Sequence, residues 1–268
     1  MEGPVVDISK LLMLDGRVAL ITGAGSGIGK AAAILFAQAG AKVGLVGRDA
    51  KELEDSQQEV GGDTLAITAD VSCPVDMERA VSQLVERFQR LDVVVANAGI
   101  NGVWAPLESL EPAEWNETIG VNLTGTFLTM KYAVPHLRQT HGNIIVNASI
   151  NGTRVFSNCG ATAYACSKAA QVSLTKMAAL ELARDGIRVN VICPGSIETP
   201  IHGKTVQREL ENVSAAVEYP EGTVPLTHGK VGAAEDVAQL MLFLASDAAK
   251  HITGTEMWID GGESLLMG

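Results

Sequence analysis

The sequence predicts an α/β fold, a doubly wound parallel sheet of seven strands with helices on both of its faces. Short, nearly continuous apolar segments alternate along the chain with longer segments of helical periodicity. This alternation is typical of a parallel sheet that is covered on both sides. A glycine-rich turn, Thr22–Gly29, also connects the first expected strand to the first expected helix, as in Rossmann-like folds.

The elements are expected in regular succession. The first strand, RVALIT, has the pattern of a buried strand, and the second strand ends at Gly47. The expected strands are Arg17–Thr22, Lys42–Val46, Leu65–Thr68, Leu91–Ala96, Asn143–Val146, Arg188–Ile192 and Glu256–Ile259. The expected helices are Lys30–Ala39, Ala50–Val60, Pro74–Gln89, Pro112–Thr140 as one long helix, Tyr164–Arg184 and Ala233–Ala245.

Residues 1–268 are expected to form a single domain, because no internal repeat and no linker rich in Pro or Ser divides them. The alternation is interrupted at Ser196–Gly229, which is rich in Pro, Glu, Thr and Val and has no strand pattern. This segment follows the C-terminal end of a strand, where doubly wound folds bind ligands. We therefore expect residues 196–229 to form a lid over a substrate.

The composition excludes several classes of protein. With 47% hydrophobic and 19% charged residues, the chain is not disordered. A net charge of −11 makes nucleic acid and acidic membrane surfaces unfavourable partners. No apolar run is long enough for a membrane helix, and no export signal is visible at the N-terminus, so a cytoplasmic location is expected. The cysteines and histidines lack metal-binding spacing, so we expect reduced thiols and no metal.

The glycine-rich turn has the pattern GxxxGxG, formed by Gly23, Gly27 and Gly29 with Ser26 and Ile28 between them. Glycine lets the chain turn sharply and brings backbone N–H groups against a pyrophosphate at a helix N-terminus. An isolated match is equally compatible with an ordinary turn. Its position between the first strand and the first helix favours a dinucleotide site.

The end of the second strand distinguishes the two nicotinamide cofactors. An acidic residue there suits the ribose hydroxyls of NAD, whereas neutral and basic residues suit NADP. Gly47, Arg48 and Asp49 occupy this position. A guanidinium matches a 2′-phosphate, so the sequence favours NADP(H). NAD(H) is the alternative, because Asp49 either caps the next helix or reaches the ribose.

A second group of residues has the chemistry of an acid/base site. Tyr164 and Lys168 are four residues apart and share one face of an expected helix. An ammonium near a phenol favours the phenolate, which makes the pair a usable acid/base. Ser149 directly follows the fifth strand. Asn122 lies inside the long helix, where asparagine is unfavourable and often bends the helix.

These residues resemble the motifs of the short-chain dehydrogenase/reductase family. The resemblance covers nearly the whole chain, and the motifs occur in the family's order and spacing. They are Thr22–Gly29, Asp70-Val71, Asn97-Ala98-Gly99, Asn122, Ser149, Tyr164, Lys168, Pro194-Gly195 and Thr199.

The resemblance implies roles for four catalytic residues. Tyr164 is the expected general acid/base. Lys168 is expected to lower the pKa of that tyrosine and to bind the nicotinamide ribose. Ser149 would orient the substrate oxygen, and Asn122 would hold a water that links Lys168 to solvent.

The resemblance also implies the cofactor contacts. For Asp70 and Asn97, capping of a strand end is an alternative interpretation. The implied contacts are Gly23, Gly27 and Gly29 at the pyrophosphate, Asp70 and Val71 at the adenine, Asn97 on the adenosine side, and Ile197 and Thr199 at the carboxamide. The further expected cofactor contacts are Ser26, Ile28, Arg48, Ala98, Gly99, Tyr164, Lys168, Pro194 and Gly195.

The implied reaction is hydride transfer between a nicotinamide cofactor and a small secondary alcohol or ketone, with Ser149, Asn151, Trp104 and Tyr164 around the substrate. A 3-oxoacyl-carrier-protein reductase is the nearest alternative. Those enzymes dock an acidic carrier with basic residues where this chain has Thr140 and Asp185, which disfavours docking. A non-catalytic NAD(P)-sensing protein is a third possibility, although such proteins typically lose the tyrosine or lysine.

The family resemblance also implies a homo-oligomer, which we expect to be a homotetramer. Trp258–Gly262 and the apolar tail Leu265–Met267 fit a C-terminal segment that is buried against a neighbouring copy.

Overall fold

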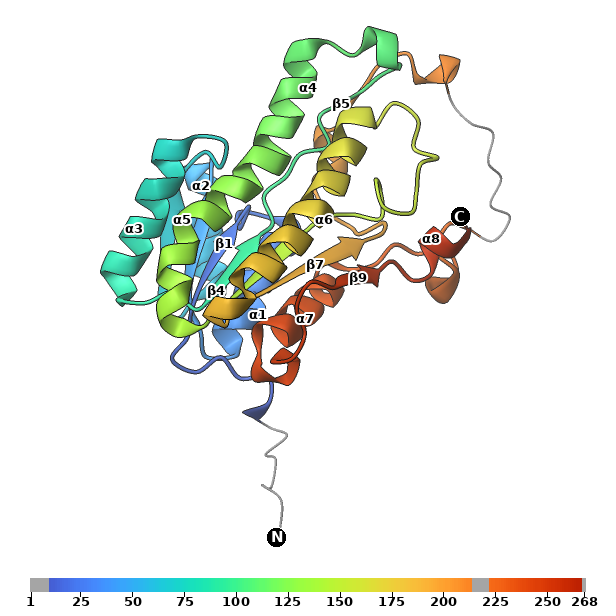
Figure 1. Cartoon of the computed structure of the whole chain (residues 1–268). Helices are drawn as coiled ribbons and strands as arrows, with labels where there is room; N and C mark the ends of the chain where they lie inside the picture. The colour runs from blue at the N-terminus through green and yellow to red at the C-terminus, as the bar shows by residue number, and fades with distance from the viewer. Residues whose placement is uncertain (1–9, 214–221, 267–268) are drawn as a thin grey trace.

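The centre of the molecule is a seven-stranded parallel sheet. In this computed structural model, which describes residues 10–213 and 222–266, the strand order is β3-β2-β1-β4-β6-β7-β9 (Figure 1). The predicted doubly wound α/β fold is therefore confirmed. The strands are β1 (Val18–Thr22), β2 (Lys42–Gly47), β3 (Thr64–Thr68), β4 (Val93–Ala96), β6 (Asn143–Asn147), β7 (Arg188–Pro194) and β9 (Glu256–Ile259).

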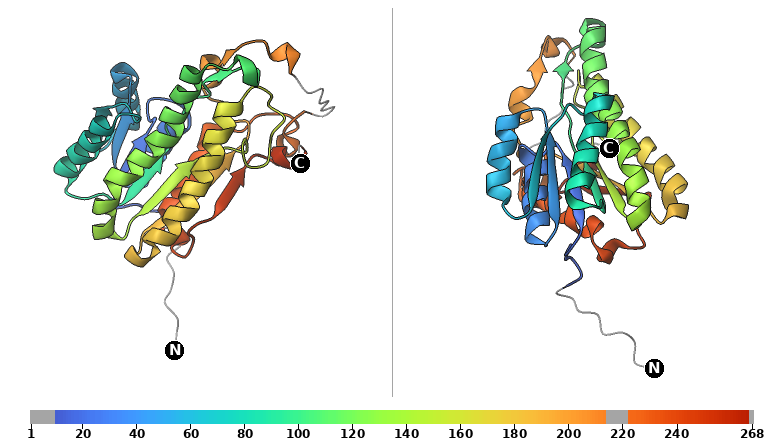
Figure 2. Two further views of the ribbon diagram at one scale, coloured as in Figure 1. Left: turned by 45° about the horizontal axis from the view of Figure 1, so that its top comes forward. Right: turned by 90° about the vertical axis from the view of Figure 1, so that its left-hand side faces the viewer.

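Helices cover both faces of this sheet (Figure 2). On one face, Met77, Leu128 and Val172 pack into a core with the sheet. On the other face, Phe36, Leu53 and Met241 do the same. The first group comes from α3 (Pro74–Phe88), α5 (Gly125–Thr140) and α6 (Thr162–Leu182), and the second from α1 (Gly27–Gln38), α2 (Ala50–Val60) and α7 (Ala234–Ala245). Within the described ranges, none of the helices has the length and hydropathy to cross a membrane.

The strand order reverses beside β1, because β2 lies on one side of it and β4 on the other. In open α/β sheets, a crevice forms at such a point, outside the carboxyl ends of the strands. The fold therefore places the residues that follow β1, β4, β6 and β7 around one crevice.

The segment Pro112–Thr140 differs from the single α-helix predicted. It consists of α4 (Pro112–Ile119), a π-helical turn (Gly120–Thr124) and α5. The side chain of Asn122 explains the π-turn: its Oδ1 accepts a hydrogen bond from the Ile100 N–H over 2.8 Å, and its Nδ2 donates to the Ile100 carbonyl over 2.9 Å. Such turns are frequent at functional sites.

The predicted lid contains a short strand that its sequence pattern does not indicate. β8 (Val206–Gln207) pairs in parallel with β5 (Val103–Trp104). Two residues are too few to show an alternating pattern, and the pairing depends on a contact between distant parts of the chain. Residues 206–213, orange in Figure 1, lie beside the upper end of α4. Residues 214–221 of the predicted lid, and Met267 of the predicted tail, lie outside the described residues.

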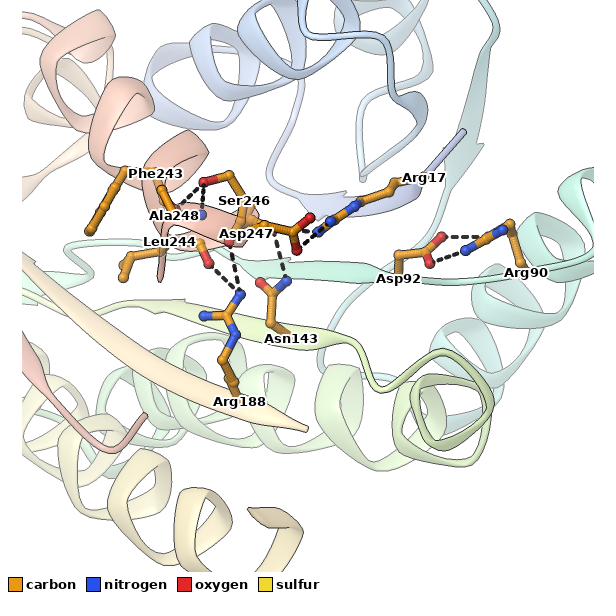
Figure 3. A network of polar contacts seen from close by, with 11 residues as sticks. Arg17, Arg90, Asp92, Asn143, Arg188, Phe243, Leu244, Ser246, Asp247 and Ala248 are labelled. Carbon is orange, nitrogen blue, oxygen red and sulfur yellow. Dashed lines mark hydrogen bonds and ion pairs between the residues drawn. The ribbon is translucent and has the colours of Figure 1, made fainter. Parts of the chain in front are cut away.

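The amino ends of the strands are joined by a polar network (Figure 3). Arg188, at the start of β7, donates to the Leu244 carbonyl over 2.8 Å, and Asn143, at the start of β6, donates to the Ala245 carbonyl over 3.2 Å. Arg17 forms an ion pair with Asp247 over 2.6 Å. The network ties the C-terminal end of α7 to the edge of the sheet that lies opposite the crevice.

Candidate active site

A cavity of about 790 Å³ opens at the carboxyl ends of the strands. It brings together most of the residues predicted from the sequence. Three of them, Gly29, Asp70 and Asn122, do not line it. Those that do are Gly23, Ser26, Gly27, Ile28, Arg48, Val71, Asn97, Ala98, Gly99, Trp104, Ser149, Asn151, Tyr164, Lys168, Pro194, Gly195, Ile197 and Thr199.

The glycine-rich turn has a conformation and a packing that require glycine. Gly23 has φ of +67°, and a Cβ atom there would lie 2.9 Å from the Cα of Ala98. A Cβ on Gly29 would lie 2.2 Å from the Gly23 carbonyl, so Gly29 packs α1 against the turn rather than facing the cavity. Ser26 precedes α1 without capping it through its side chain. The N–H groups of the first turn thus have no side-chain cap, which suits a pyrophosphate.

Two asparagines connect the strand ends beneath the cavity. Asn97 donates through Nδ2 to the Thr22 carbonyl over 2.9 Å, and its Oδ1 accepts from Asn147 over 2.8 Å. Asn97 therefore ties the ends of β1, β4 and β6 together while it also lines the cavity. Sequence reasoning did not identify Asn147, although a polar residue at the end of an apolar strand was a usable signal.

Asp70 does not line the cavity, and its carboxylate accepts hydrogen bonds from Ser72. Its Oδ1 accepts from the N–H and the hydroxyl of Ser72, over 2.9 and 2.7 Å. Burial raises the pKa of Asp70, but these hydrogen bonds and the charge of Arg48 outweigh burial and lower it. The capping interpretation therefore describes the Asp70 side chain, and Val71 is the neighbour that lines the cavity.

The residues that follow β2 differ in what their side chains contact. Asp49 caps α2, because its carboxylate accepts from the Glu52 N–H over 3.0 Å. Arg48 is exposed and lines the cavity. Glu52 also lines the cavity and forms an ion pair with Lys204 of the lid over 3.3 Å.

Tyr164 lies in the first turn of α6, beside Ser149. The ammonium of Lys168 is 5.5 Å from the centre of its ring. Burial raises the pKa of Tyr164, although a hydrogen bond with the Ser149 hydroxyl lowers it. Burial outweighs this hydrogen bond, because the phenolate would lose its hydration, and the lowering of this pKa by Lys168 stays a prediction.

Lys168 is 4% exposed, and its ammonium donates to the main-chain carbonyl of Asn147 over 2.8 Å. Burial lowers the pKa of Lys168 to about 8, while the nearby Cys193 acts in the opposite direction. The lysine therefore lies at the bottom of the site, where the loss of hydration makes its charged form less stable than in water.

Asn122 lies behind Lys168 and is fully buried. Its Nδ2 donates to the Ile100 carbonyl and to the Ser167 hydroxyl. Its main-chain carbonyl accepts from the side chains of Thr126 and Gln171. The Ile100 N–H already occupies one lone pair of Oδ1. The second lone pair of this oxygen is therefore the one that can accept a hydrogen bond from a water.

Trp104 and Asn151, both predicted to face the substrate, line the cavity. Trp104 lines it from β5, with an indole N–H that is buried without a partner among the described residues. The Asn151 N–H donates to the Ser149 hydroxyl over 3.1 Å, and the Asn151 side chain accepts from Asn158 over 2.9 Å. Arg208 fastens the lid to Glu114 with two hydrogen bonds of 2.9 and 3.0 Å.

Glu263 is a cavity residue that sequence reasoning missed. It is 6% exposed, and its two carboxylate oxygens accept from the N–H and the hydroxyl of Ser196, over 2.7 and 2.8 Å. It belongs to α8 (Glu263–Leu266), a short helix after β9. No motif marks it, because its partner lies 67 residues earlier in the chain.

Comparison with known proteins gives the class of the protein. A family model described as enoyl-(acyl carrier protein) reductase matches residues 23–264. The relatives include the 3-oxoacyl-[acyl-carrier-protein] reductase of Thermotoga maritima, 39% identical over 94% of this chain and 99% of the relative. Levodione reductase of Leifsonia aquatica is 38% identical over 92% of this chain and 94% of the relative.

Solved structures agree with these relatives. A 3-ketoacyl-ACP reductase from Sinorhizobium meliloti superposes with a TM-score of 0.89 and 52% identity, covering 93% of this chain and all of that one. A 3-ketoacyl-(acyl-carrier-protein) reductase from Brucella melitensis, solved with NADH, has a TM-score of 0.84 and 34% identity over 94% of this chain and 99% of that one. Fold, site and relatives together define a nicotinamide-dependent oxidoreductase. The chain belongs to the short-chain dehydrogenase/reductase family.

Proposed function

We propose that this enzyme interconverts small ketones and secondary alcohols, with NADP(H) as the favoured cofactor. The observation that carries the proposal is the convergence of Tyr164, Ser149 and Lys168 at one wall of a cavity whose other end is the glycine-rich turn. A bound nicotinamide would supply or accept the hydride. Tyr164 would donate a proton to the carbonyl oxygen, and the Ser149 hydroxyl would hydrogen-bond the same oxygen.

The protonation state of Tyr164 suits the direction of reduction. Because burial raises its pKa, the phenol keeps its proton at neutral pH and can act as a general acid. Lys168 would contribute to binding the cofactor ribose from its fixed position on the Asn147 carbonyl. Asn122 would hold a relay water through its remaining lone pair.

The preference for NADP(H) rests on Arg48 and Asp49. The exposed Arg48 guanidinium can form paired hydrogen bonds with a 2′-phosphate. Asp49 is engaged in capping α2, so it is less suited to bind ribose hydroxyls. NAD(H) is the alternative that a direct comparison of the two cofactors must test.

A depletion screen tests the proposed reaction. The purified protein would be incubated with small secondary alcohols or ketones and with NAD(H) or NADP(H) in parallel, and the absorbance of the reduced cofactor would be recorded. We expect turnover of free small substrates, faster with the phosphorylated cofactor. Cofactor binding without turnover across the screen would instead indicate the non-catalytic sensing protein.

A 3-oxoacyl-carrier-protein reductase is a second candidate, favoured by the names of two similar proteins. The charges near the positions where an acidic carrier protein would dock disfavour this candidate. Asp185 is ion-paired with Arg138 over 2.8 Å, so a carboxylate occupies one of these positions and also engages the nearest basic residue. Comparing 3-oxoacyl groups on carrier protein and on a short pantetheine analogue separates the candidates. A large advantage for the carrier-linked substrate would favour the second one.

We propose a homotetramer of single-domain subunits in the cytoplasm. The exposed side chains Phe127, Met177 and Leu180 on α5 and α6 are apolar, which is unusual for a surface that faces only water. Leu265 and Leu266 are also exposed beside the C-terminus. Light scattering on the purified protein gives the subunit number directly, and a monomeric mass would contradict this proposal.

A further inference from the structure

Hydrogen bonds hold both the main chain and the side chain of Ser196. Its N–H and its hydroxyl donate to the two oxygens of Glu263 over 2.7 and 2.8 Å, and its carbonyl accepts from the Gly232 N–H over 2.9 Å. Gly195 admits no side chain here, because a Cβ atom would lie 2.6 Å from the Glu263 Oε2. Glu263 and Gly232 thus fix the residue that precedes Ile197.

This anchoring determines how Ile197 presents its main chain. Gly232 pairs with the residues on either side of Ile197, since it donates to Ser196 and accepts from Glu198, each over 2.9 Å. In parallel pairing, the residue between two such bonds directs its own N–H and C=O to the opposite side. Ile197 lines the cavity, and within the described ranges neither of these groups has a hydrogen-bond partner.

A primary carboxamide has one acceptor and two donors. It can therefore pair with a donor and an acceptor that lie side by side, as the N–H and C=O of Ile197 do. The glycine-rich turn at the other end of the same cavity is shaped to receive a pyrophosphate. The residues present therefore fit a nicotinamide dinucleotide, with the Ile197 main chain at the carboxamide end.

Glu263 is an unusual choice of anchor. A buried carboxylate is unfavourable unless hydrogen bonds or a cation compensate for its lost hydration. In the part of the chain that the structure describes, no ion pair involves Glu263, and both hydrogen bonds to its carboxylate come from Ser196. Its own position is fixed by Asp260, which accepts from the N–H groups of Glu263 and Ser264.

We propose that Glu263 is a positioning residue for the nicotinamide half of the cofactor. By holding Ser196, it presents the N–H and C=O of Ile197 to the carboxamide, while the adenosine half is bound independently at the far end of the cavity. The inference rests on the proposed function, because it assumes that a nicotinamide cofactor binds. It adds the C-terminal helix to the cofactor site.

The test compares a complete cofactor with a fragment that lacks nicotinamide. Titration calorimetry would measure the binding of NADPH and of 2′-phospho-ADP-ribose to the wild type, to Glu263→Gln and to the control Glu256→Gln. Glu256 is a carboxylate on β9 that is paired with Lys176 and does not line the cavity. We expect Glu263→Gln to weaken NADPH binding about tenfold, the usual effect of losing a charge-assisted hydrogen bond, and to leave fragment binding unchanged.

The outcomes are distinct. Equal weakening of both ligands would assign Glu263 a general structural role and overturn the proposal, as would unchanged NADPH binding. If Glu263→Gln does not fold, Ser196→Ala replaces it. That variant removes one of the two hydrogen bonds and is expected to weaken only NADPH, by a smaller factor. Binding of neither ligand by the wild type would refute the proposed function, and this inference with it.

Discussion

The ammonium of Lys168 donates a hydrogen bond to the main-chain carbonyl of Asn147, the last residue of β6, over 2.8 Å. The side chain of Asn147 in turn donates to Asn97 at the end of β4. The position of the lysine is therefore set by the sheet and not by Tyr164.

Lys168→Met should stabilise the protein in the absence of cofactor, and the gain should fall as the pH rises. The pKa of Lys168 is about 8 in the folded protein, against 10.5 ordinarily. Between these values the unfolded chain binds more protons, so the wild type gains stability as the pH increases. The burial penalty is fully present below pH 8 and amounts to about 3 kcal/mol. The lost hydrogen bond to Asn147 offsets part of the gain. Melting temperatures measured from pH 7 to 10.5 check this, and a constant difference between variant and wild type would contradict it.

Tyr164→Phe should abolish turnover and preserve cofactor binding. The substitution removes the only atom of this side chain that can donate a proton, and loss of a general acid reduces rates by roughly 10²–10⁴-fold. Tyr132→Phe, on α5, is a matched control because it removes a hydroxyl that does not line the cavity. Steady-state rates and calorimetric cofactor binding give the two readouts. Turnover like that of the wild type in Tyr164→Phe would refute the catalytic assignment.

The pH profiles of reduction and oxidation should differ in sign. Reduction needs the phenol of Tyr164 and should fall at alkaline pH, whereas oxidation needs the phenolate and should rise. Since the Ser149 hydroxyl lowers the pKa of Tyr164, Ser149→Ala should shift both profiles to higher pH. The value of kcat/KM in each direction as a function of pH measures this. A shift to lower pH would show that Ser149 acts otherwise.

Arg48→Ala should reduce selectivity for the phosphorylated cofactor. Loss of a guanidinium that binds phosphate with paired hydrogen bonds should weaken NADPH by about tenfold or more and NADH by less than about threefold. Arg79→Ala, an exposed arginine on α3, controls for the general change in charge. Dissociation constants for both cofactors decide the result. Equal weakening of NADPH and NADH would show that Arg48 does not contact the 2′-phosphate.

Arg208→Ala should loosen the lid and raise KM for the substrate several-fold, with a smaller effect on kcat. The guanidinium of Arg208, the residue after β8, pairs with Glu114 at the start of α4, so we expect its loss to free the segment that is expected to cover the substrate. Glu114→Ala should produce the same change, and the double variant should add little to either single one. Additive effects of the two substitutions would indicate that the ion pair does not hold the lid.

Much of the fold was predictable because aliphatic runs determine buried parallel strands locally. Val93–Ala96 and Arg188–Pro194 lie within two residues of their expected bounds. The π-turn at Asn122 was not predictable, because the side chain bonds to Ile100, on a separate segment. The pairing of β5 with β8 escaped prediction for the same reason.

The candidate site was predictable where a residue type carries the chemistry itself. Tyr164, Lys168 and Ser149 meet at one cavity, as their order and spacing predicted. The direction of the pKa shift of Tyr164 could not be predicted, because it depends on burial, which the sequence does not specify. Glu263 could not be identified from the sequence, because what distinguishes it is a contact with Ser196, which lies far from it in the chain.

The polar network at the amino ends of the strands has a consequence for how this enzyme can change. Arg188, Asn143 and Arg17 fasten the helix after the lid to the sheet at the edge opposite the cavity. These contacts involve none of the residues in the loops around the cavity. Those loops are free to be exchanged or lengthened in the laboratory or during divergence, and a new specificity could be acquired without first repairing the scaffold that carries it.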